Sequence, residues 1–220
     1  ATGPKVASST QNQALSAILF LYRHVLNVEL PWLDRLVRAK RPQRIPTVMS
    51  RAEVMQLLDQ MNGTPRLVAA LLYGSGMRLM ECMRLRVKDV DLNRSEIRVR
   101  NGKGAKDRVT MLPESLHKGL EAQLIDARGL HREDLMKGRG SVAMPESLKL
   151  KYPNAEKEWI WQWVFPATRT YVDIEMGVRR RHHLHESVIQ REVRAAAIRA
   201  GIPRRVGCHT LRHSFATHLL

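Results

Sequence analysis

Cysteine is scarce in this chain of 220 residues, which contains only Cys82 and Cys208, in unrelated sequence contexts. Two such cysteines form no disulfide framework, so the sequence favours a reducing compartment. Long apolar runs are also missing: the most apolar stretch, residues 14–26, contains Arg23 and His24 and is too short to cross a bilayer. No charged segment with a following apolar run opens the chain, so we expect no signal peptide and no membrane partner.

Acidic residues are few relative to basic ones. The chain has 37 Lys and Arg against 21 Asp and Glu, a formal net charge of +16. Self-repulsion on this scale opposes a compact fold unless a polyanion offsets it, which makes nucleic acid the first partner to consider. A merely basic soluble protein and a membrane-surface binder are the alternatives. Basic segments occur along the whole chain rather than in one tail or one amphipathic helix, which favours nucleic acid.

Hydrophobic residues make up 44% of the chain, enough for a packed core, and their spacing divides the sequence in two. Residues 14–28 carry apolar side chains at helical spacing, and one such helix cannot bury its apolar face alone. We therefore interpret residues 1–37 as the remnant of a helical domain. Residues 38–47 are basic and proline-bearing, which is typical of a linker and suits contact with a phosphate backbone. A second unit covers residues 48–220.

The second unit is predicted to be mainly helical. Ser50 and Glu53 match a capping box, which predicts a helix to about Met61. Further helices are expected over residues 66–73, 79–85, 113–127, 186–200 and 209–220. Residues 97–100 and 108–112 are predicted as two antiparallel strands joined by a basic connection. The fold class is therefore α+β, mainly helical with a small antiparallel sheet.

Three short stretches, far apart in the sequence, contain residue types that suit phosphoryl chemistry. They are the Gly-rich turn that leads to Arg78, the connection 102–108 with Lys103, and the segment 209–213 with His209 and Arg212. Together and in this order they resemble the tyrosine recombinases, the family of phage integrases and chromosome-dimer resolvases. The resemblance covers roughly residues 48–220 and implies an enzyme that breaks and rejoins DNA.

The resemblance assigns a role to each of these residues. Strand exchange without ATP keeps the bond energy in a covalent 3′-phosphotyrosine intermediate, and negative charge grows on the non-bridging oxygens of the attacked phosphate. Arg78 and Arg212 match the family's two arginines, which donate paired hydrogen bonds to those oxygens. Lys103 matches the lysine that protonates the 5′-oxygen, and His209 matches the histidine that supports the nucleophile and the phosphate. No metal or other cofactor is implied, because the arginines supply the positive charge.

Each residue also has a structural interpretation. Arg78 could cap a helix, Lys103 could be a solvated hairpin tip, and Arg212 could pair with an acid on its own helix. Together, in this order and at this spacing, the residues favour the catalytic interpretation. Lys106 and Arg108 are expected to contact the DNA backbone rather than the reacting atoms.

The sequence has no tyrosine at the place where the family has its nucleophile. In the family, a glycine–histidine segment and then the nucleophilic tyrosine follow the helix that begins at His209. All tyrosines of this sequence precede that helix: Tyr22, Tyr73, Tyr152 and Tyr171. We therefore expect the chain as given to bind DNA and hold a phosphate but not to cleave it.

Residues 138–184 indicate which subfamily of the tyrosine recombinases the chain resembles. They include a tryptophan-rich segment, 159–166, and a basic run, 181–183, and they are similar to the insertion that marks integron integrases. In that subfamily the insertion binds bases flipped out of a folded single-stranded recombination site, and a base that stacks on an indole or imidazole ring contributes about 1–3 kcal/mol. The predicted DNA-binding residues of this insertion are Trp161, Arg181, His182 and His183, with Trp161 and His183 contacting bases.

The same residues have two other interpretations. The tryptophans at positions 159, 161 and 163 could form a core cluster, since this spacing suits one face of a strand, and at least one is expected to be buried. His182, His183 and His185 could instead bind a metal, but no pattern of cysteines or carboxylates accompanies them.

The sequence thus predicts an integron integrase, a bacterial cytoplasmic recombinase that captures and excises gene cassettes. By resemblance its partners are DNA, as folded single-stranded and duplex recombination sites, and further copies of itself in a tetramer on DNA. A chromosomal or phage-type recombinase that acts on duplex sites is the alternative within the enzyme class. A non-catalytic DNA-binding fragment is the alternative outside it.

Overall fold

The computed structural model describes residues 6–28, 38–40, 46–100, 106–145, 148 and 151–219. The chain forms two compact units, Ala1–Ile45 and Pro46–Leu220, and the boundary between them falls inside the segment 38–47 that was predicted as a linker. Of the helices within the described ranges, none is long and apolar enough to cross a membrane. The two units are described separately.

The first unit contains one described helix, α1 (Ser8–Phe20), which continues into the π-helical segment η1 (Leu21–Val25). The predicted helix over 14–28 is therefore present and begins earlier than expected. Asn12 is buried and ties α1 to residues 38–40, because its Nδ2 donates to Ala39 O (2.8 Å) and its Oδ1 accepts from Ala39 N (2.9 Å). Apolar side chains of this helix remain exposed, among them Ile18, Phe20 and Leu21.

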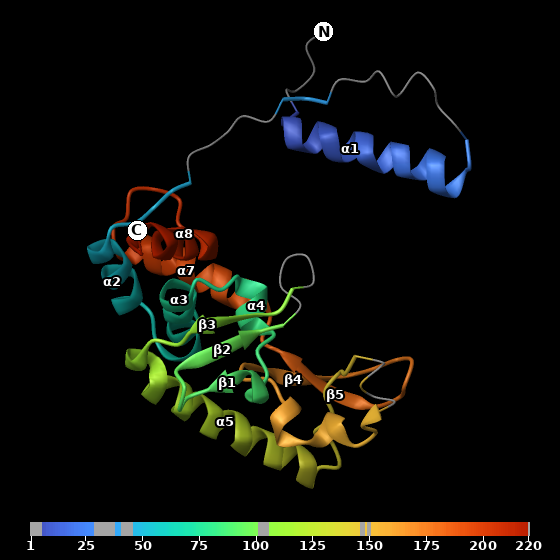
Figure 1. Cartoon of the computed structure of the whole chain (residues 1–220), viewed down its shortest axis with the longest axis vertical. Helices are drawn as coiled ribbons and strands as arrows, with labels where there is room; N and C mark the ends of the chain where they lie inside the picture. Colours follow the sequence, from blue (N-terminus) through green and yellow to red (C-terminus); the bar gives the residue numbers. More distant parts are fainter. Residues whose placement is uncertain are drawn as a thin grey trace. The chain divides into compact units, whose positions relative to one another are not determined.

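The second unit is mainly helical (Figure 1). Its described α-helices are α2 (Arg51–Asp59), α3 (Gly63–Ser75), α4 (Leu79–Met83), α5 (His117–Met136), α7 (Glu186–Arg199) and α8 (Cys208–His218). Each predicted helix is present, but α3 begins before residue 66 and α5 continues past residue 127. Short 3-10 segments lie between them: η3 (Val87–Asp89), η4 (Glu114–Leu116), η5 (Ala155–Lys157) and η6 (Trp159–Trp161).

Two small antiparallel sheets complete the second unit. Strands β1 (Val90–Asp91), β2 (Glu96–Val99) and β3 (Arg108–Met111) form the first sheet in the order β1-β2-β3, with Ile97 opposite both Val90 and Thr110. Strands β4 (Pro166–Val172) and β5 (Arg179–His183) form the second. The predicted fold class, mainly helical with a small antiparallel sheet, is confirmed. Strand β1 and the second sheet were not predicted.

Helix α3 is the centre of the hydrophobic core. It packs against α8, α7 and α2, and its far end contacts α4 and β3. Buried apolar side chains from these elements form one cluster, which includes Leu57, Leu71, Leu72, Ile97, Ile189 and Leu211. Each such side chain contributes about 1.5–3 kcal/mol when it leaves water. The core therefore holds α4, β3 and α8, which are distant in sequence, in one place.

Local sequence signals explain how the helices begin and end. Ser50 Oγ accepts from Glu53 N (3.2 Å) and Glu53 Oε2 accepts from Ser50 N (2.7 Å), so the predicted capping box is present. Helix α3 ends at Gly76, whose φ of 63° lies in the left-handed region that glycine adopts without strain. A Cβ on Gly76 would lie 2.5 Å from the ring of Phe215 in α8. Gly76 therefore permits both the turn and the close approach of α8.

The predicted insertion, residues 138–184, is joined to the core by main-chain hydrogen bonds. Val87 N donates to Gln162 O (3.0 Å), and Val164 N donates to Leu85 O (2.9 Å). Residues 85–87 directly follow α4 in the sequence. The insertion is therefore attached to the segment that leads away from Arg78.

Candidate active site

Arg78 lies on the turn between α3 and α4, at the capping position of α4. Its backbone nitrogen donates to Glu81 Oε2 (2.8 Å), and its Nη1 donates to Glu81 Oε1 (2.7 Å). Because Glu81 stands on the first turn of α4, its carboxylate both caps the helix and orients the arginine. Arg78 can therefore cap helix α4 and also belong to the candidate active site.

Two further arginines from distant segments meet the same carboxylate. Arg108 of β3 donates from Nη1 to Glu81 Oε1 (3.0 Å) and from Nη2 to Glu81 Oε2 (2.6 Å). Arg212 of α8 places its Nη1 3.8 Å from Glu81 Oε2. Arg212 thus faces an acid of another helix rather than one of its own. Three elements bring three guanidinium groups around one carboxylate.

Glu81 is ionised at neutral pH. Burial raises the pKa of its carboxyl group, but the hydrogen bonds from Arg108 and Arg78 outweigh burial and lower the pKa to about 2. Three guanidinium groups at +1 and one carboxylate at −1 leave this cluster with a net charge of +2. A phosphodiester is the type of ligand that this charge and donor geometry favour.

Arg212 retains hydrogen-bonding capacity that the fold does not use. Its Nη1 is buried and has no hydrogen-bond partner among the described residues. Burial and the neighbouring Arg78 lower the pKa of this guanidinium, Glu81 opposes them, and Arg108 lowers it further. The group stays charged at neutral pH even so. A buried donor is costly unless an acceptor reaches it, so Nη1 of Arg212 is where an anion would be stabilised most.

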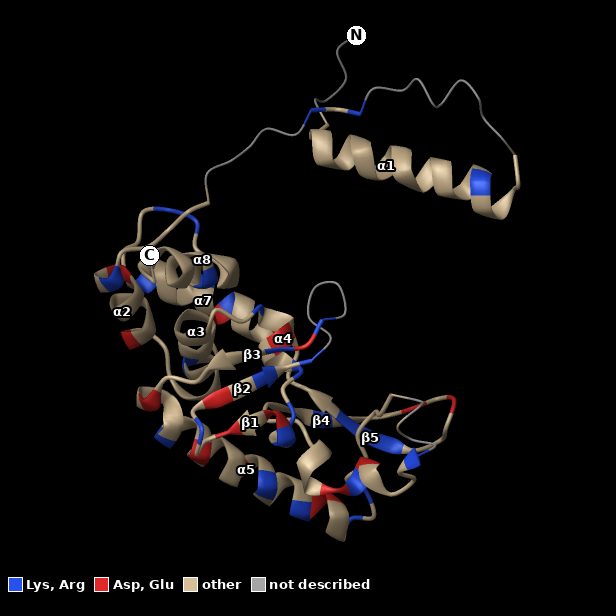
Figure 2. Cartoon of the chain, viewed as in Figure 1, with Lys and Arg blue, Asp and Glu red and all other residues tan. Residues whose placement is uncertain are grey.

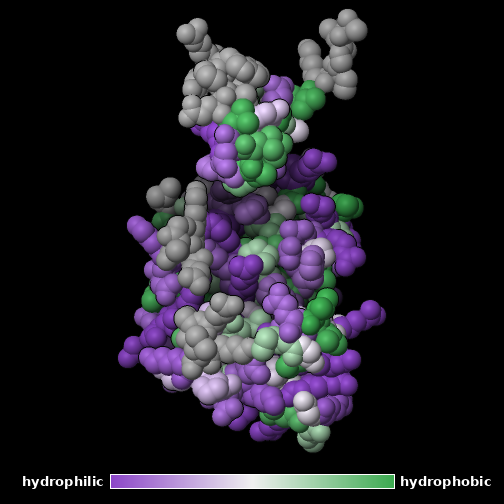
Figure 3. All heavy atoms as spheres, turned by 90° about the vertical axis from the view of Figure 1, so that its right-hand side faces the viewer, coloured by the Kyte–Doolittle hydropathy of each residue, from purple (hydrophilic) through white to green (hydrophobic). Residues whose placement is uncertain are grey.

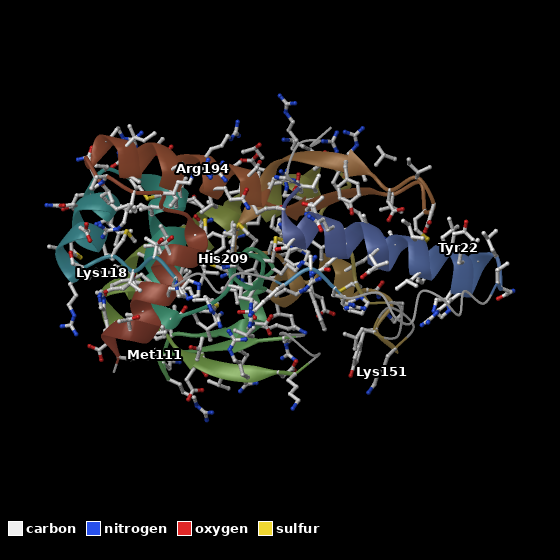
Figure 4. All side chains as sticks on the ribbon, turned by 90° about the horizontal axis from the view of Figure 1, so that it is seen from above. Tyr22, Met111, Lys118, Lys151, Arg194 and His209 are labelled. Atoms are coloured by element: carbon white, nitrogen blue, oxygen red, sulfur yellow. The ribbon has the colours of Figure 1, made fainter. Side chains whose placement is uncertain are left out.

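The other two predicted catalytic residues differ in how far the structure describes them. His209 (labelled in Figure 4) is exposed on the first turn of α8. It precedes Arg212 by three residues, and this helical spacing places both on one face of the helix. Lys103 belongs to residues 101–105 and lies outside the described residues. The structure therefore brings Arg78, Arg212 and His209 into one region and leaves Lys103 a prediction.

Lys106 and Arg108, both predicted to contact the DNA backbone, have different surroundings. Lys106 is exposed just before β3. The guanidinium of Arg108 is committed to Glu81, and this hydrogen bond raises the pKa of Arg108. Arg108 is therefore a part of the cluster. Glu81 was not among the predicted site residues, because an acid three residues after Arg78 is also the signal of an ordinary helix cap.

A cleft of about 590 Å³ opens beside Arg78 and Glu81. Its lining residues come from α4, the segment after it, the ends of β2 and β3, and the insertion: Arg78, Met80, Glu81, Arg84, Arg86, Lys88, Asp89, Arg100, Asp107, Pro145, Leu148, Trp161 and Trp163. Five of them are Lys or Arg and three are Asp or Glu. Hydrophilic residues also cover most of the face shown in Figure 3. The cleft therefore combines excess positive charge with aromatic surface.

The tryptophans of the insertion have distinct surroundings. Trp163 is buried, as expected for at least one of them, with Arg86 Cζ 4.0 Å from its ring centroid. Trp161 is half-buried on the cleft wall, and Lys88 Nζ lies 3.0 Å from its ring centroid. Residues 159–161 form the 3-10 segment η6, so the alternative that places the tryptophans on one face of a strand is wrong.

The predicted DNA contact of Arg181 needs correction. Strand β5 is rich in basic residues (Figure 2), but Arg181 Nε lies 2.6 Å and Nη2 2.8 Å from the carboxylate oxygens of Asp134 in α5. Its Nη1 donates to Ala167 O (2.6 Å) and Thr168 O (2.9 Å). The guanidinium therefore joins α5 to the β4–β5 hairpin instead of facing DNA.

The predicted base contact of His183 also needs correction, whereas His182 is exposed as a DNA contact requires. His183 is 5% exposed, packs edge-on against Trp163 with ring centroids 5.4 Å apart, and has its pKa lowered by burial. A buried ring offers no free face to a base. The ring of His182 lies 6.2 Å from that of Tyr171. No group of three or more His, Cys, Asp or Glu in the described part of the chain is placed to hold a metal.

Sequence comparison relates the chain to known recombinases. The profile of the phage integrase family matches residues 47–220. An integrase/recombinase of Escherichia coli is 47% identical over 216 residues, a match that covers 98% of this chain and 64% of that protein. The chain thus spans less than two thirds of the length of this relative.

Structural comparison gives the same relationship. The crystal structure of XerA recombinase matches with a TM-score of 0.52 at 27% identity, over 98% of this chain and 63% of that one. XerH recombinase, bound to a palindromic difH substrate, shares the fold with a TM-score of 0.62 at 20% identity, over 98% of this chain and 55% of that one. The family profile covers most of the chain, from the linker through the arginine cluster, and the chain belongs to the phage integrase family of tyrosine recombinases.

Proposed function

We propose that this chain is part of an integron-type site-specific recombinase that exchanges DNA strands through a 3′-phosphotyrosine intermediate. The observation that carries the proposal is the cluster of Arg78, Arg108 and Arg212 around Glu81, with Nη1 of Arg212 buried and without a hydrogen-bond partner among the described residues. In this proposal residues 48–220 are the catalytic domain, residues 1–37 belong to a helical core-binding domain, and residues 38–47 link the two.

The cluster suits the chemistry of an attacked phosphodiester. Arg78 and Arg212 donate to the non-bridging oxygens, and Glu81 keeps Arg78 in place. As a tyrosine hydroxyl attacks phosphorus in line, charge grows on those oxygens and the guanidinium groups stabilise it. The bond to the 5′-oxygen breaks, and Lys103 supplies the proton that this oxygen needs. His209, one turn before Arg212, supports the nucleophile and the phosphate.

Each tyrosine of the second unit contacts a residue that does not belong to this cluster. Tyr73 is hydrogen bonded through its hydroxyl to His218 Nδ1 (2.9 Å), and Tyr171 packs on His182. Lys151 Nζ lies 5.4 Å from the ring centroid of Tyr152. We therefore propose that the chain as given binds DNA and holds a phosphate without forming the covalent intermediate.

A nicked suicide substrate tests the catalytic proposal, because it traps the covalent protein–DNA complex. The chain as given should form none, and a version extended to the full length of its Escherichia coli relative, of which this chain matches 64%, should form it. Replacing Arg78 or Arg212 by Ala in the extended version should slow trapping by about 10³–10⁵. Arg94→Ala is the control, since this exposed arginine pairs with Asp91 and does not line the cleft. Trapping at the wild-type rate in Arg212→Ala would refute the role of the cluster.

The integron-type proposal rests on the insertion. Trp161 stands on the wall of a basic cleft beside Arg78, and exposed His182 lies on the neighbouring hairpin. An extrahelical base that stacks on Trp161 would lie close to the scissile phosphate. Such contacts contribute about 1–3 kcal/mol per base and do not require a fixed sequence. The second candidate is a chromosomal or phage-type recombinase acting on duplex sites, which the similarity to XerA favours.

Binding to two DNA forms separates the candidates. An integron-type protein should prefer a folded single-stranded hairpin with bulged bases over a perfect duplex of matching sequence. Trp161→Ala should remove most of that preference, because it should weaken hairpin binding more than duplex binding, which phosphate contacts carry. Trp159→Ala is the matched control, because this half-buried tryptophan does not line the cleft. Equal affinity of the wild type for both DNA forms would favour the duplex recombinase.

A further inference from the structure

Lys88 is a residue of the cleft that the proposed function does not use. It lies in η3, is half-buried, and lines the same cleft as Arg78 and Glu81. Its Nζ is 3.0 Å from the centroid of the Trp161 ring. Lysine side chains are usually flexible and keep the ammonium group in water, whereas here an aromatic face holds it in place.

The carboxylates that line the cleft are engaged with arginines rather than with Lys88. Asp89 accepts a hydrogen bond from Arg100 Nε (2.6 Å), and Asp107 lies 3.8 Å from Arg100 Nη1. Glu81 is held in the arginine cluster. Within the described ranges, Lys88 forms no ion pair with a carboxylate, although it is partly withdrawn from water.

The surroundings of Lys88 favour an anionic ligand. Burial and the nearby Arg100 lower the pKa of Lys88 to about 8, Asp89 opposes this, and Arg86 lowers it further. No carboxylate of the described residues forms an ion pair with this ammonium group, and its partial burial costs free energy. An anionic ligand would accept the N–H donors and restore an ordinary pKa.

We propose that Lys88 binds a second DNA phosphate, on the same strand as the phosphate held by Arg78 and Arg212, and that the Trp161 ring orients the ammonium group for this contact. The inference rests on the proposed function, because one cleft joins Lys88 to the arginine cluster. Contacts to phosphates position a DNA strand without reading its sequence. Lys88 is thus a strand-positioning residue and takes no part in bond breaking.

The salt dependence of DNA binding tests this assignment. Affinity of the full chain for a labelled duplex oligonucleotide is measured between about 50 and 200 mM salt, where each lost phosphate contact reduces the slope of log K against log salt by about 0.9. Lys88→Gln should show this reduction and weaker binding, and Lys88→Arg should keep the wild-type slope. Lys118→Gln is the matched control: it removes one charge from Lys118 (labelled in Figure 4), which is exposed at the start of α5 and does not line the cleft.

A pH series gives a readout that a merely structural role would not change. The charged groups that face Lys88 are Arg86, Asp89 and Arg100, and Lys88 is the one among them expected to lose its charge on moderate alkalisation. The difference in affinity between the wild type and Lys88→Gln should therefore shrink as the pH is raised from 7 to about 9, which stays below the pKa of about 10 that burial gives Arg86. Lys88→Arg should stay tight-binding throughout that range, since its charge does not titrate.

Three outcomes would overturn or redirect the inference. If Lys88→Gln binds DNA with the wild-type salt slope, Lys88 contacts no phosphate. If Lys118→Gln reduces the slope equally, the effect reflects net charge alone. A melting temperature of Lys88→Gln far below that of Lys88→Arg would assign Lys88 to the fold instead. Failure of the wild-type chain to bind DNA at all would refute the proposed function rather than the role of Lys88 within it.

Discussion

Replacing Glu81 by Gln tests whether the carboxylate is what holds the arginine cluster together. The side chain of Glu81 is 8% exposed and accepts hydrogen bonds from Arg78 and Arg108 through both of its oxygens. Gln has nearly the same shape, but it carries no charge and turns one acceptor into a donor. Its NH₂ group would face the guanidinium donors, and the positive charges would repel one another without compensation.

The magnitude follows from the pKa of Glu81. Lowering the pKa of this carboxyl group from 4.5 to about 2 corresponds to about 3 kcal/mol of folding free energy at neutral pH. Because the folded-state pKa is depressed, this contribution is complete above the unfolded pKa and is lost as the pH falls towards the folded value. About 2 kcal/mol of it should be gone by pH 3. Glu81→Gln should therefore be about 3 kcal/mol less stable at pH 7 and much closer to wild type in acid.

Urea unfolding of both proteins at pH 7 and at successively lower pH measures this difference. Glu133→Gln is the control, because Glu133 is an exposed partner of Lys137 and its loss should cost less than about 1 kcal/mol. An unchanged unfolding free energy of Glu81→Gln at pH 7 would show that the cluster is not stabilised by this carboxylate. A loss of equal size at every pH would show that the amide disturbs packing rather than charge.

Two other perturbations have definite expected outcomes. Gly76→Ala should destabilise the fold more than Gly201→Ala by about 1–3 kcal/mol in urea unfolding, because both positions have positive φ but only at Gly76 would the new Cβ meet a ring, that of Phe215. Equal losses would contradict that contact. Burial lowers the pKa of His131 in the folded protein below its ordinary value of 6.5. As the pH falls below about 6.5, the unfolded chain therefore binds a proton at His131 before the folded protein does, and the free energy of unfolding decreases. Unfolding free energies at pH 7.5 and 5.5 should therefore differ less for His131→Gln than for the wild type; an equal difference would refute this.

The sequence predicts helices well where local signals agree with packing. The capping box at Ser50 and the helical spacing after Glu186 both mark helices that the structure contains. The helix that begins near Pro113 was predicted to end near Ala127, two residues before Gly129. The helix continues to Met136, and its second half places His131 and Asp134 against the insertion, where they are buried. Tertiary contacts thus override the local cost of a glycine.

The candidate site was likewise predicted only in part, because local sequence signals do not show tertiary contacts. Arg78 and Arg212 stand out through resemblance, and the structure brings both to Glu81. Glu81 itself has the local appearance of a helix cap, and only its contacts with β3 and α8 show that it organises the cluster. The sequence also does not distinguish a basic residue that faces solvent from one that forms an ion pair inside the fold. Arg181 is of the second kind, since its partner Asp134 lies on another element.

Main-chain hydrogen bonds join residues 85–87 to residues 162–164 of the insertion. They limit how the insertion can be transferred between proteins by engineering. Deleting the insertion would remove the acceptor of Val87 N and the donor to Leu85 O, and it would also strip the buried side chains of Val164 and Phe165 from the core. A graft onto another recombinase would need a recipient segment after α4 with free backbone groups in the same register. The insertion is therefore not a portable module: transplantation requires moving the α4–β1 segment along with it.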